Sequence, residues 1–267
     1  MYVSCTIADL QEKETQEFDA WLHLQSIGNE IILDLPIKFH KHLNKIAVQG
    51  KRLNSYIITD KYVQLAYEIP NKPLKTGFNA IGIDTGINAL ASINTGAQFG
   101  LDIKPIIERV KRCGQGSNGQ KTARRALKQR MDEVAKEILN HFKDVDCIVV
   151  EALKNLNYKT KLRRRLSRNI RCSIGTWAYR YWLRRLEQAC EMNRVHFKSV
   201  APAYTSQRCP SCGYTDRGNR QGTEFKCLSC GHEGNADVVG SLNILWRFLT
   251  GPYGAGYKPY ELGLNHS

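Results

Sequence analysis

The sequence lacks the long apolar segments that a membrane span or a secretory leader requires. Its uninterrupted apolar runs are short, such as Cys147-Ile-Val-Val150, and no basic stretch followed by an apolar block stands near residue 1. A helix that crosses a bilayer needs about 20 consecutive, mostly apolar residues. We therefore expect no membrane span, no signal peptide and no membrane partner. The sequence also contains no internal repeat.

Cysteine usage favours free thiols over a disulfide framework. Of the nine cysteines, four form two CxxC pairs and the other five are scattered singly, at Cys5, Cys113, Cys147, Cys172 and Cys190. Isolated thiols of this kind are typical of buried residues in a reducing compartment. The expected location is therefore the cytoplasm. Association with the nucleoid is expected as well, because the chain is strongly basic. The seven histidines show no spacing that is typical of metal ligands.

Acidic residues are scarce relative to basic ones. Lys and Arg number 39 against 25 acids, a formal net charge of +14, and residues 159–194 alone hold eleven basic residues against two acids. So dense a cluster attracts phosphate backbones, and arginine can bind two phosphate oxygens at once. Alternatively, the cluster could be a solvated helix face, or it could bind membrane lipids or an acidic protein. The predicted nucleic-acid contacts are Arg163, Arg164, Arg165, Arg168 and Arg171.

Two regions of different pattern follow one another along the chain. Residues 1–78 predict a small β-rich module, with strands at 31–36 and 61–69, followed by a turn-rich linker at 70–77. From residue 78, strands and helices alternate. Strands are expected at 80–84, 89–94, 146–151 and 195–200, and helices around Leu127 to Ile138, at 173–193 and at 236–249. This order predicts an α/β fold, a mixed sheet flanked by helices.

The strongest motif is a pair of CxxC knuckles separated by fourteen residues. Cys209, Cys212, Cys227 and Cys230 supply four thiolates, which is the ligand set of a tetrahedral zinc. Because no position is left open for water, we expect the zinc to be structural rather than catalytic.

Three carboxylates lie at the end of a strand or at the start of a helix. Asp84 and Glu151 each terminate an apolar strand, and Asp237 lies in the first turn of the closing helix. Each has an ordinary explanation as a turn former, a sheet-edge residue or a helix N-terminal acid. Together they predict a catalytic magnesium site, because phosphodiester hydrolysis commonly uses divalent ions held by carboxylates.

Four segments resemble, in order, the RuvC-type nuclease segments of TnpB proteins, the transposon-encoded relatives of type V CRISPR effectors. They are Gly82-Ile-Asp-Thr-Gly86, Ile148-Val-Val-Glu-Ala-Leu-Lys154, residues 203–213 and residues 227–245. The resemblance covers roughly residues 78–247. It implies an RNase H-like fold, catalytic roles for Asp84, Glu151 and Asp237, an inserted zinc ribbon, and RNA-guided cleavage of DNA.

The resemblance also implies domain limits and partners. The expected parts are a module similar to the later strands of a wedge barrel at 1–78, nuclease segments at 79–204 and 235–267, and a zinc ribbon at 205–234. The expected partners are a DNA target and a guide RNA. TnpB proteins usually carry a longer N-terminal portion, so self-association or a second protein could supply recognition. Two alternatives stay open: a cleavage-deficient RNA-guided DNA-binding protein or transposon remnant, and a structure-selective nuclease that needs no guide.

Overall fold

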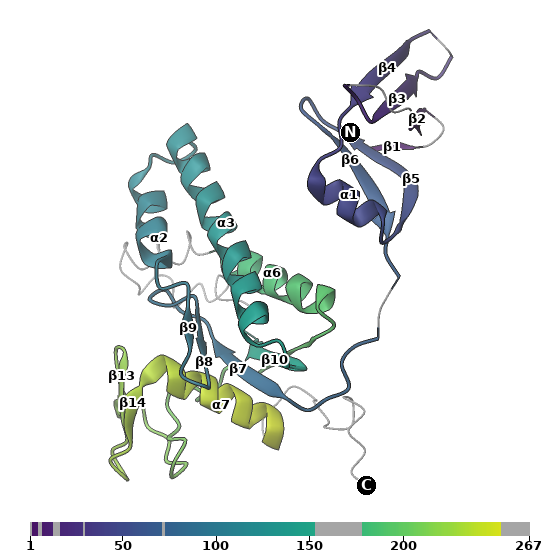
Figure 1. Ribbon diagram of the computed structural model, residues 1–267. Helices are drawn as coiled ribbons and strands as arrows, with labels where there is room; N and C mark the ends of the chain where they lie inside the picture. Colours follow the sequence, from purple (N-terminus) through teal and green to yellow (C-terminus); the bar gives the residue numbers. More distant parts are fainter. Residues whose placement is uncertain are drawn as a thin grey trace. The chain divides into compact units, whose positions relative to one another are not determined.

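The computed structural model describes residues 2–4, 7–12, 17–28, 30–70, 73–152 and 178–251. The chain forms two compact units, Met1–Lys72 and Pro73–Ser267 (Figure 1). The segment that follows Pro73 belongs to the larger unit because its backbone amides form hydrogen bonds with residues of that unit. The amide of Lys75 donates to the carbonyl of Arg194, and the amide of Asn79 donates to the Asp146 carboxylate.

The smaller unit is rich in β structure, as its alternating pattern predicts. One antiparallel sheet orders its strands as β1 (Tyr2–Ser4), β5 (Lys51–Ile58) and β6 (Val63–Glu68). The other contains β2 (Ala8–Gln11), β3 (Ala20–Gln25) and β4 (Ile32–Ile37). Leu10, Leu22 and Tyr56 are buried in a shared core. A short helix, α1 (Lys41–Ala47), was not predicted.

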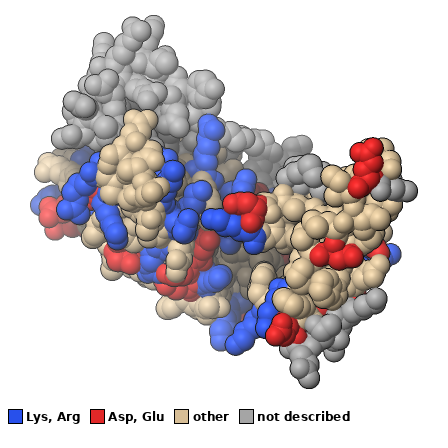
Figure 2. All heavy atoms as spheres, turned by 90° about the horizontal axis from the view of Figure 1, so that it is seen from above, with Lys and Arg blue, Asp and Glu red and all other residues tan. Residues whose placement is uncertain are grey.

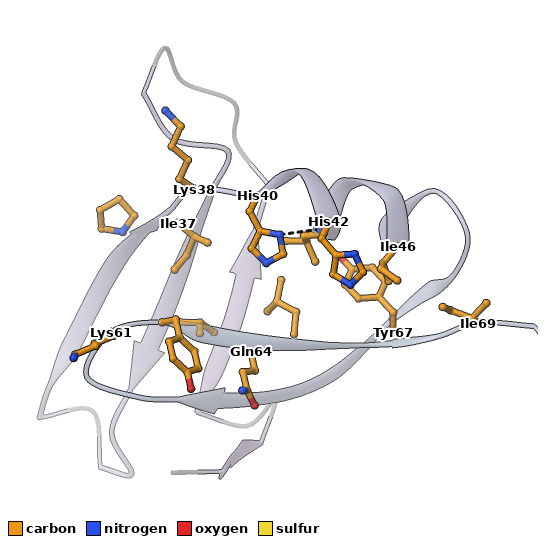
Figure 3. Close-up of a pocket in the computed structure, with 14 residues that line it drawn as sticks. Ile37, Lys38, His40, His42, Ile46, Lys61, Gln64, Tyr67 and Ile69 are labelled. Atoms are coloured by element: carbon orange, nitrogen blue, oxygen red, sulfur yellow. Dashed lines mark hydrogen bonds between the residues drawn. The ribbon is translucent and has the colours of Figure 1, made fainter. Parts of the chain in front are cut away.

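A groove of about 880 Å³ lies in this smaller unit (Figure 3). The imidazole of His40 accepts a hydrogen bond from the Leu43 amide and so caps α1, and it stacks on His42 with ring centroids 6.1 Å apart. Lys38 and Lys61 also line the groove, and its lining contains no acidic side chain. The groove is therefore neutral to positive, and it contains none of the predicted site residues.

A five-stranded mixed sheet forms the centre of the larger unit. Its order is β11 (His196–Val200), β10 (Cys147–Glu151), β7 (Ala80–Asp84), β8 (Ala91–Ile93) and β9 (Gln98–Phe99). Strands β7, β10 and β11 are parallel, whereas β8 and β9 form antiparallel pairs. The expected mixed α/β sheet is thus confirmed, and the strands expected at 80–84 and 89–94 contain β7 and β8, which pair in antiparallel fashion.

Helices cover both faces of this sheet (Figure 1). On one face pack α2 (Ile103–Arg112), α3 (Asn118–His141) and α6 (Tyr179–Met192), and on the other packs α7 (Ala236–Thr250). Strand β10 shows the division, because Ile148 and Val150 join the core of the first face and Cys147 and Val149 join that of α7. Helix α2 was not predicted.

The segment between β11 and α7 folds as a small antiparallel ribbon. It contains the 3-10 turn η1 (Arg217–Asn219) and strands β12 (Arg220–Gln221), β13 (Glu224–Lys226) and β14 (Glu233–Asn235). The ribbon leads directly into α7, whose N-cap Asn235 accepts hydrogen bonds from the amides of Asp237 and Val238. Within the described ranges, no helix combines the length and apolar character needed to cross a membrane.

Candidate functional site

Parallel pairing of β7 and β10 brings two of the predicted acids to the same edge of the sheet. In the register of this pair Ile83 lies opposite Val150, so the next residues, Asp84 and Glu151, follow at adjacent strand ends. Because side chains alternate between faces along a strand, both acids share the face that is covered by α7. Two side chains 67 positions apart in the sequence therefore become neighbours.

The third acid, Asp237, is supplied by the first turn of α7 and is only 9% exposed. Two glycines let this helix approach the sheet closely. A Cβ atom on Gly240 would lie 2.8 Å from Oδ2 of Asp84, and one on Gly82 would overlap the carbonyl oxygen of Ser241. The helix can thus hold Asp237 above the strand ends only because both positions lack a side chain.

The electrostatics of the site reflect the burial of its carboxylates. Burial raises the pKa of Asp84 to about 7, with further contributions from the charges of Glu151 and Asp237 and partial compensation from Arg220. Burial also raises the pKa of Glu151, opposed by the hydrogen bond from Thr205 and by the charges of Arg247 and Arg220. A desolvated group of carboxylates favours the binding of a cation.

Arg220 reaches this group from the ribbon. Its Nη2 atom lies 2.7 Å from Oδ1 of Asp237, in an ion pair between β12 and α7. Two other basic residues near the cysteines contact other groups. Lys226 pairs with Glu233 at 2.6 Å, and the guanidinium of Arg208 lies over the Trp246 ring, 3.7 Å from its centroid.

Further residues around Glu151 were not identified as site residues from the sequence. The hydroxyl of the buried Thr205 donates to the Glu151 carboxylate, and the hydroxyl of Tyr179 donates to the Glu151 carbonyl at 2.9 Å. The side chain of Tyr179 is itself buried. Thr205 belongs to a segment that the sequence singled out, residues 203–213, but its hydroxyl carried no recognisable signal there.

The four predicted zinc ligands converge. Their Sγ atoms all lie within 4.8 Å of one another, with 3.6 Å between Cys209 and Cys230 and between Cys212 and Cys227. A tetrahedral zinc with bonds of about 2.3 Å requires about 3.8 Å between sulfurs. The cluster could therefore hold a zinc ion. Among the residues that the structure describes, it is the single group of potential metal ligands that converges this tightly, so the three carboxylates are more widely spaced.

The predicted nucleic-acid contacts Arg163, Arg164, Arg165, Arg168 and Arg171 lie outside the described residues. A second basic surface was not predicted. Figure 2 shows Lys and Arg side chains gathered over the helical layer of the larger unit. There α2 and α3 expose Arg109, Arg112, Lys121, Arg124 and Arg125, none of which forms an ion pair within the described part of the chain. Five exposed cations without an acidic partner in the described ranges give these two helices an excess of positive charge.

Known proteins resemble the chain in sequence and in fold. The family model described as "Cas12f1-like, TNB domain" matches residues 179–244, which run from α6 through the ribbon into α7. The CRISPR-associated endodeoxyribonuclease Cas12f1 of Sulfoacidibacillus thermotolerans is 27% identical over 211 residues, covering 68% of this chain and 49% of the relative. The putative RNA-guided DNA endonuclease InsQ of Escherichia coli (strain K12) is 29% identical over 203 residues, covering 65% of this chain and 50% of the relative.

Among solved structures, that of the mini-RNA-guided endonuclease CRISPR-Cas_phi3 matches with a TM-score of 0.54 at 13% identity, covering 89% of this chain and 58% of that chain. At this identity the match concerns the fold alone. The chain spans about half the length of the curated relatives named above. A third relative, a TnpB-like protein of Aquifex aeolicus (strain VF5), is 29% identical over 134 residues, covering 47% of this chain and 42% of the relative. These comparisons support the membership of this chain in the TnpB family.

Proposed function

We propose that this chain is the nuclease portion of a magnesium-dependent, RNA-guided DNA endonuclease. The observation that carries the proposal is the meeting of Asp84, Glu151 and Asp237, from β7, β10 and α7, at one edge of the sheet beneath a single helix. The names of the relatives support the same class of activity. The cysteine cluster is proposed to bind a structural zinc that fixes the ribbon.

The acidic site fits divalent cations by the chemistry of its donors. Three carboxylates offer oxygen ligands of the kind that magnesium prefers, and burial makes their unneutralised charge costly. Sites with two ions roughly 3.5 to 4 Å apart accommodate carboxylates that do not touch one another. When bound, such ions would stabilise the attacking and leaving oxygens of a phosphodiester.

The remaining residues of the site would orient these ligands and the substrate. Thr205 and Tyr179 hold the carboxylate and the carbonyl of Glu151. Arg220 lies at the border of the acidic group, and its planar guanidinium can bind two oxygens of a phosphate. The exposed cations of α2 and α3, together with the excess of basic residues at 159–194, would attract the backbone of the guide or the target.

The test is cleavage of labelled DNA by the chain purified together with any RNA that accompanies it, which is also sequenced. Asp84→Ala and Glu151→Ala should each reduce the cleavage rate by at least roughly 100-fold, or about 2.7 kcal/mol of transition-state stabilisation. Nucleic-acid binding should change little. Asp144→Ala is the matched control, because Asp144 is exposed in the turn that precedes β10.

The outcomes separate the proposal from its alternatives. Cleavage that persists in both alanine variants would refute the assignment of the acids. Cleavage of branched or single-stranded DNA by RNA-free protein would indicate a guide-independent nuclease. A defined RNA bound to a wild-type chain that does not cut DNA in magnesium would indicate an RNA-guided binding protein.

A further inference from the structure

Thr205 presents a buried hydroxyl to the proposed metal site. The residue is 3% exposed, and its Oγ1 atom donates a hydrogen bond to Oε1 of Glu151. The carbonyl oxygen of Pro202 lies 3.2 Å from the same hydroxyl. A hydroxyl has a single proton to donate, and an ionised carboxylate is the stronger acceptor of the two. The geometry therefore directs the proton of Thr205 toward Glu151.

The backbone around Thr205 is held in place from α7. The side-chain amide of Asn243, which is 2% exposed, donates to the carbonyl oxygens of Thr205 and Arg208, both at 2.8 Å. The preceding residue, Tyr204, has a φ of 62°, which is uncommon for a bulky side chain. Such a conformation persists where the surrounding structure enforces it, commonly at functional sites. The helix that carries Asp237 thus also positions the hydroxyl that contacts Glu151.

Only the carboxylate of Glu151 needs this support, because its backbone is already fixed. The Glu151 carbonyl accepts from Tyr179, and the amide of the next residue, Ala152, donates to Val200 in β11. The side chain is long and would otherwise retain rotamer freedom at the strand end. A hydrogen bond to one carboxylate oxygen removes that freedom and leaves the second oxygen for another partner.

We propose that Thr205 is a positioning residue that holds Oε1 of Glu151, so that the second carboxylate oxygen faces the divalent cation. This inference rests on the proposed function, since it assigns a task toward a cation that Glu151 would bind. Partners that orient metal ligands in this way typically contribute about 10- to 100-fold in metal affinity or activity.

The experiment compares Thr205→Val, which keeps the shape and removes the hydroxyl, with Thr205→Ser, which retains the hydroxyl. Manganese binding is measured without nucleic acid, by electron paramagnetic resonance of the free ion, on the full chain with its zinc in place. Thr205→Val should weaken manganese binding at least about 10-fold, and Thr205→Ser should stay within about 3-fold of wild type. Thr250→Val is the matched control, because among the described residues its hydroxyl bonds only within α7, to the carbonyl of Trp246.

Melting temperature and far-ultraviolet circular dichroism distinguish loss of positioning from loss of folding. Unchanged manganese affinity in a folded Thr205→Val variant would overturn the proposal, and so would a folded Thr205→Ser variant as impaired as Thr205→Val. Failure of the proposed function gives a different result. In that case the wild-type chain itself would not bind manganese at this site, and Glu151→Ala would leave the binding curve unchanged.

Discussion

The replacement Asp84→Asn tests the electrostatics of the site through stability. In the metal-free fold the pKa of Asp84 is raised from 3.8 to about 7, chiefly by burial and then by the charges of Glu151 and Asp237. Between these two pH values the folded chain keeps a proton that the unfolded chain has released. The contribution of Asp84 to stability is therefore full below about pH 4 and is lost as the pH rises through 7.

The size of the effect follows from the pKa difference. At about 1.4 kcal/mol per pKa unit, raising the pKa from 3.8 to about 7 costs the fold at most about 4 kcal/mol above pH 7. Partial exposure of the carboxylate to water makes this value an upper bound. Asparagine keeps the shape but cannot ionise, so Asp84→Asn should be more stable than wild type at pH 8 and similar to it near pH 4.

Urea unfolding at several pH values measures this difference. Trp182 is a suitable fluorescent reporter, because it is buried in the larger unit and its indole N–H donates to the Thr85 hydroxyl at 3.3 Å, next to Asp84. Magnesium-free buffers without chelator would leave in place the zinc proposed for the ribbon. Adding magnesium should stabilise wild type at pH 8 but not Asp84→Asn.

Asp144→Asn is the control for the change of residue type, because Asp144 is exposed. Stability curves of wild type and Asp84→Asn that run parallel between pH 4 and pH 8 would refute the reasoning. Such a result would mean that Asp84 ionises as readily in the fold as in the unfolded chain.

Three further changes test how the site is assembled. Gly240→Ala should destabilise the chain by about 1 to 3 kcal/mol, because the added Cβ lies 2.8 Å from Oδ2 of Asp84. Urea unfolding measures this change, and unchanged stability would argue against a close approach of α7 to the sheet. Arg220→Gln should tighten manganese binding by roughly 10-fold, or about 1.4 kcal/mol, by removing the cation that pairs with Asp237; weaker binding would contradict this. Removing zinc with a chelator, or introducing Cys230→Ser, should unfold the ribbon and raise the rate of hydrogen exchange at the Arg220 amide. An amide that stays protected from exchange would mean that the ribbon folds without its metal.

Local patterns predicted most elements of the larger unit. Leu127, Met131, Val134 and Ile138 recur at helical spacing and are buried on one face of α3, as expected. Helix α2 was not recognised because it is ten residues long and carries Pro105, a residue that normally argues against a helix but is tolerated in the first turn. The basic surface of α2 and α3 was overlooked for a related reason. Its cations come from two helices, so neither segment alone equals the density of charge at residues 159–194.

The sequence by itself determined which side chains could bind metals. The spacing of Cys209, Cys212, Cys227 and Cys230 is local chemistry, since each pair lies on one knuckle. The strand ends at Asp84 and Glu151 are likewise marked by the apolar residues before them. Only the tertiary structure decided which groups meet, because strand pairing depends on contacts across the whole sheet. The pairing of β7 with β10, the Arg220–Asp237 ion pair and the hydrogen bond from Thr205 to Glu151 all join residues from different elements.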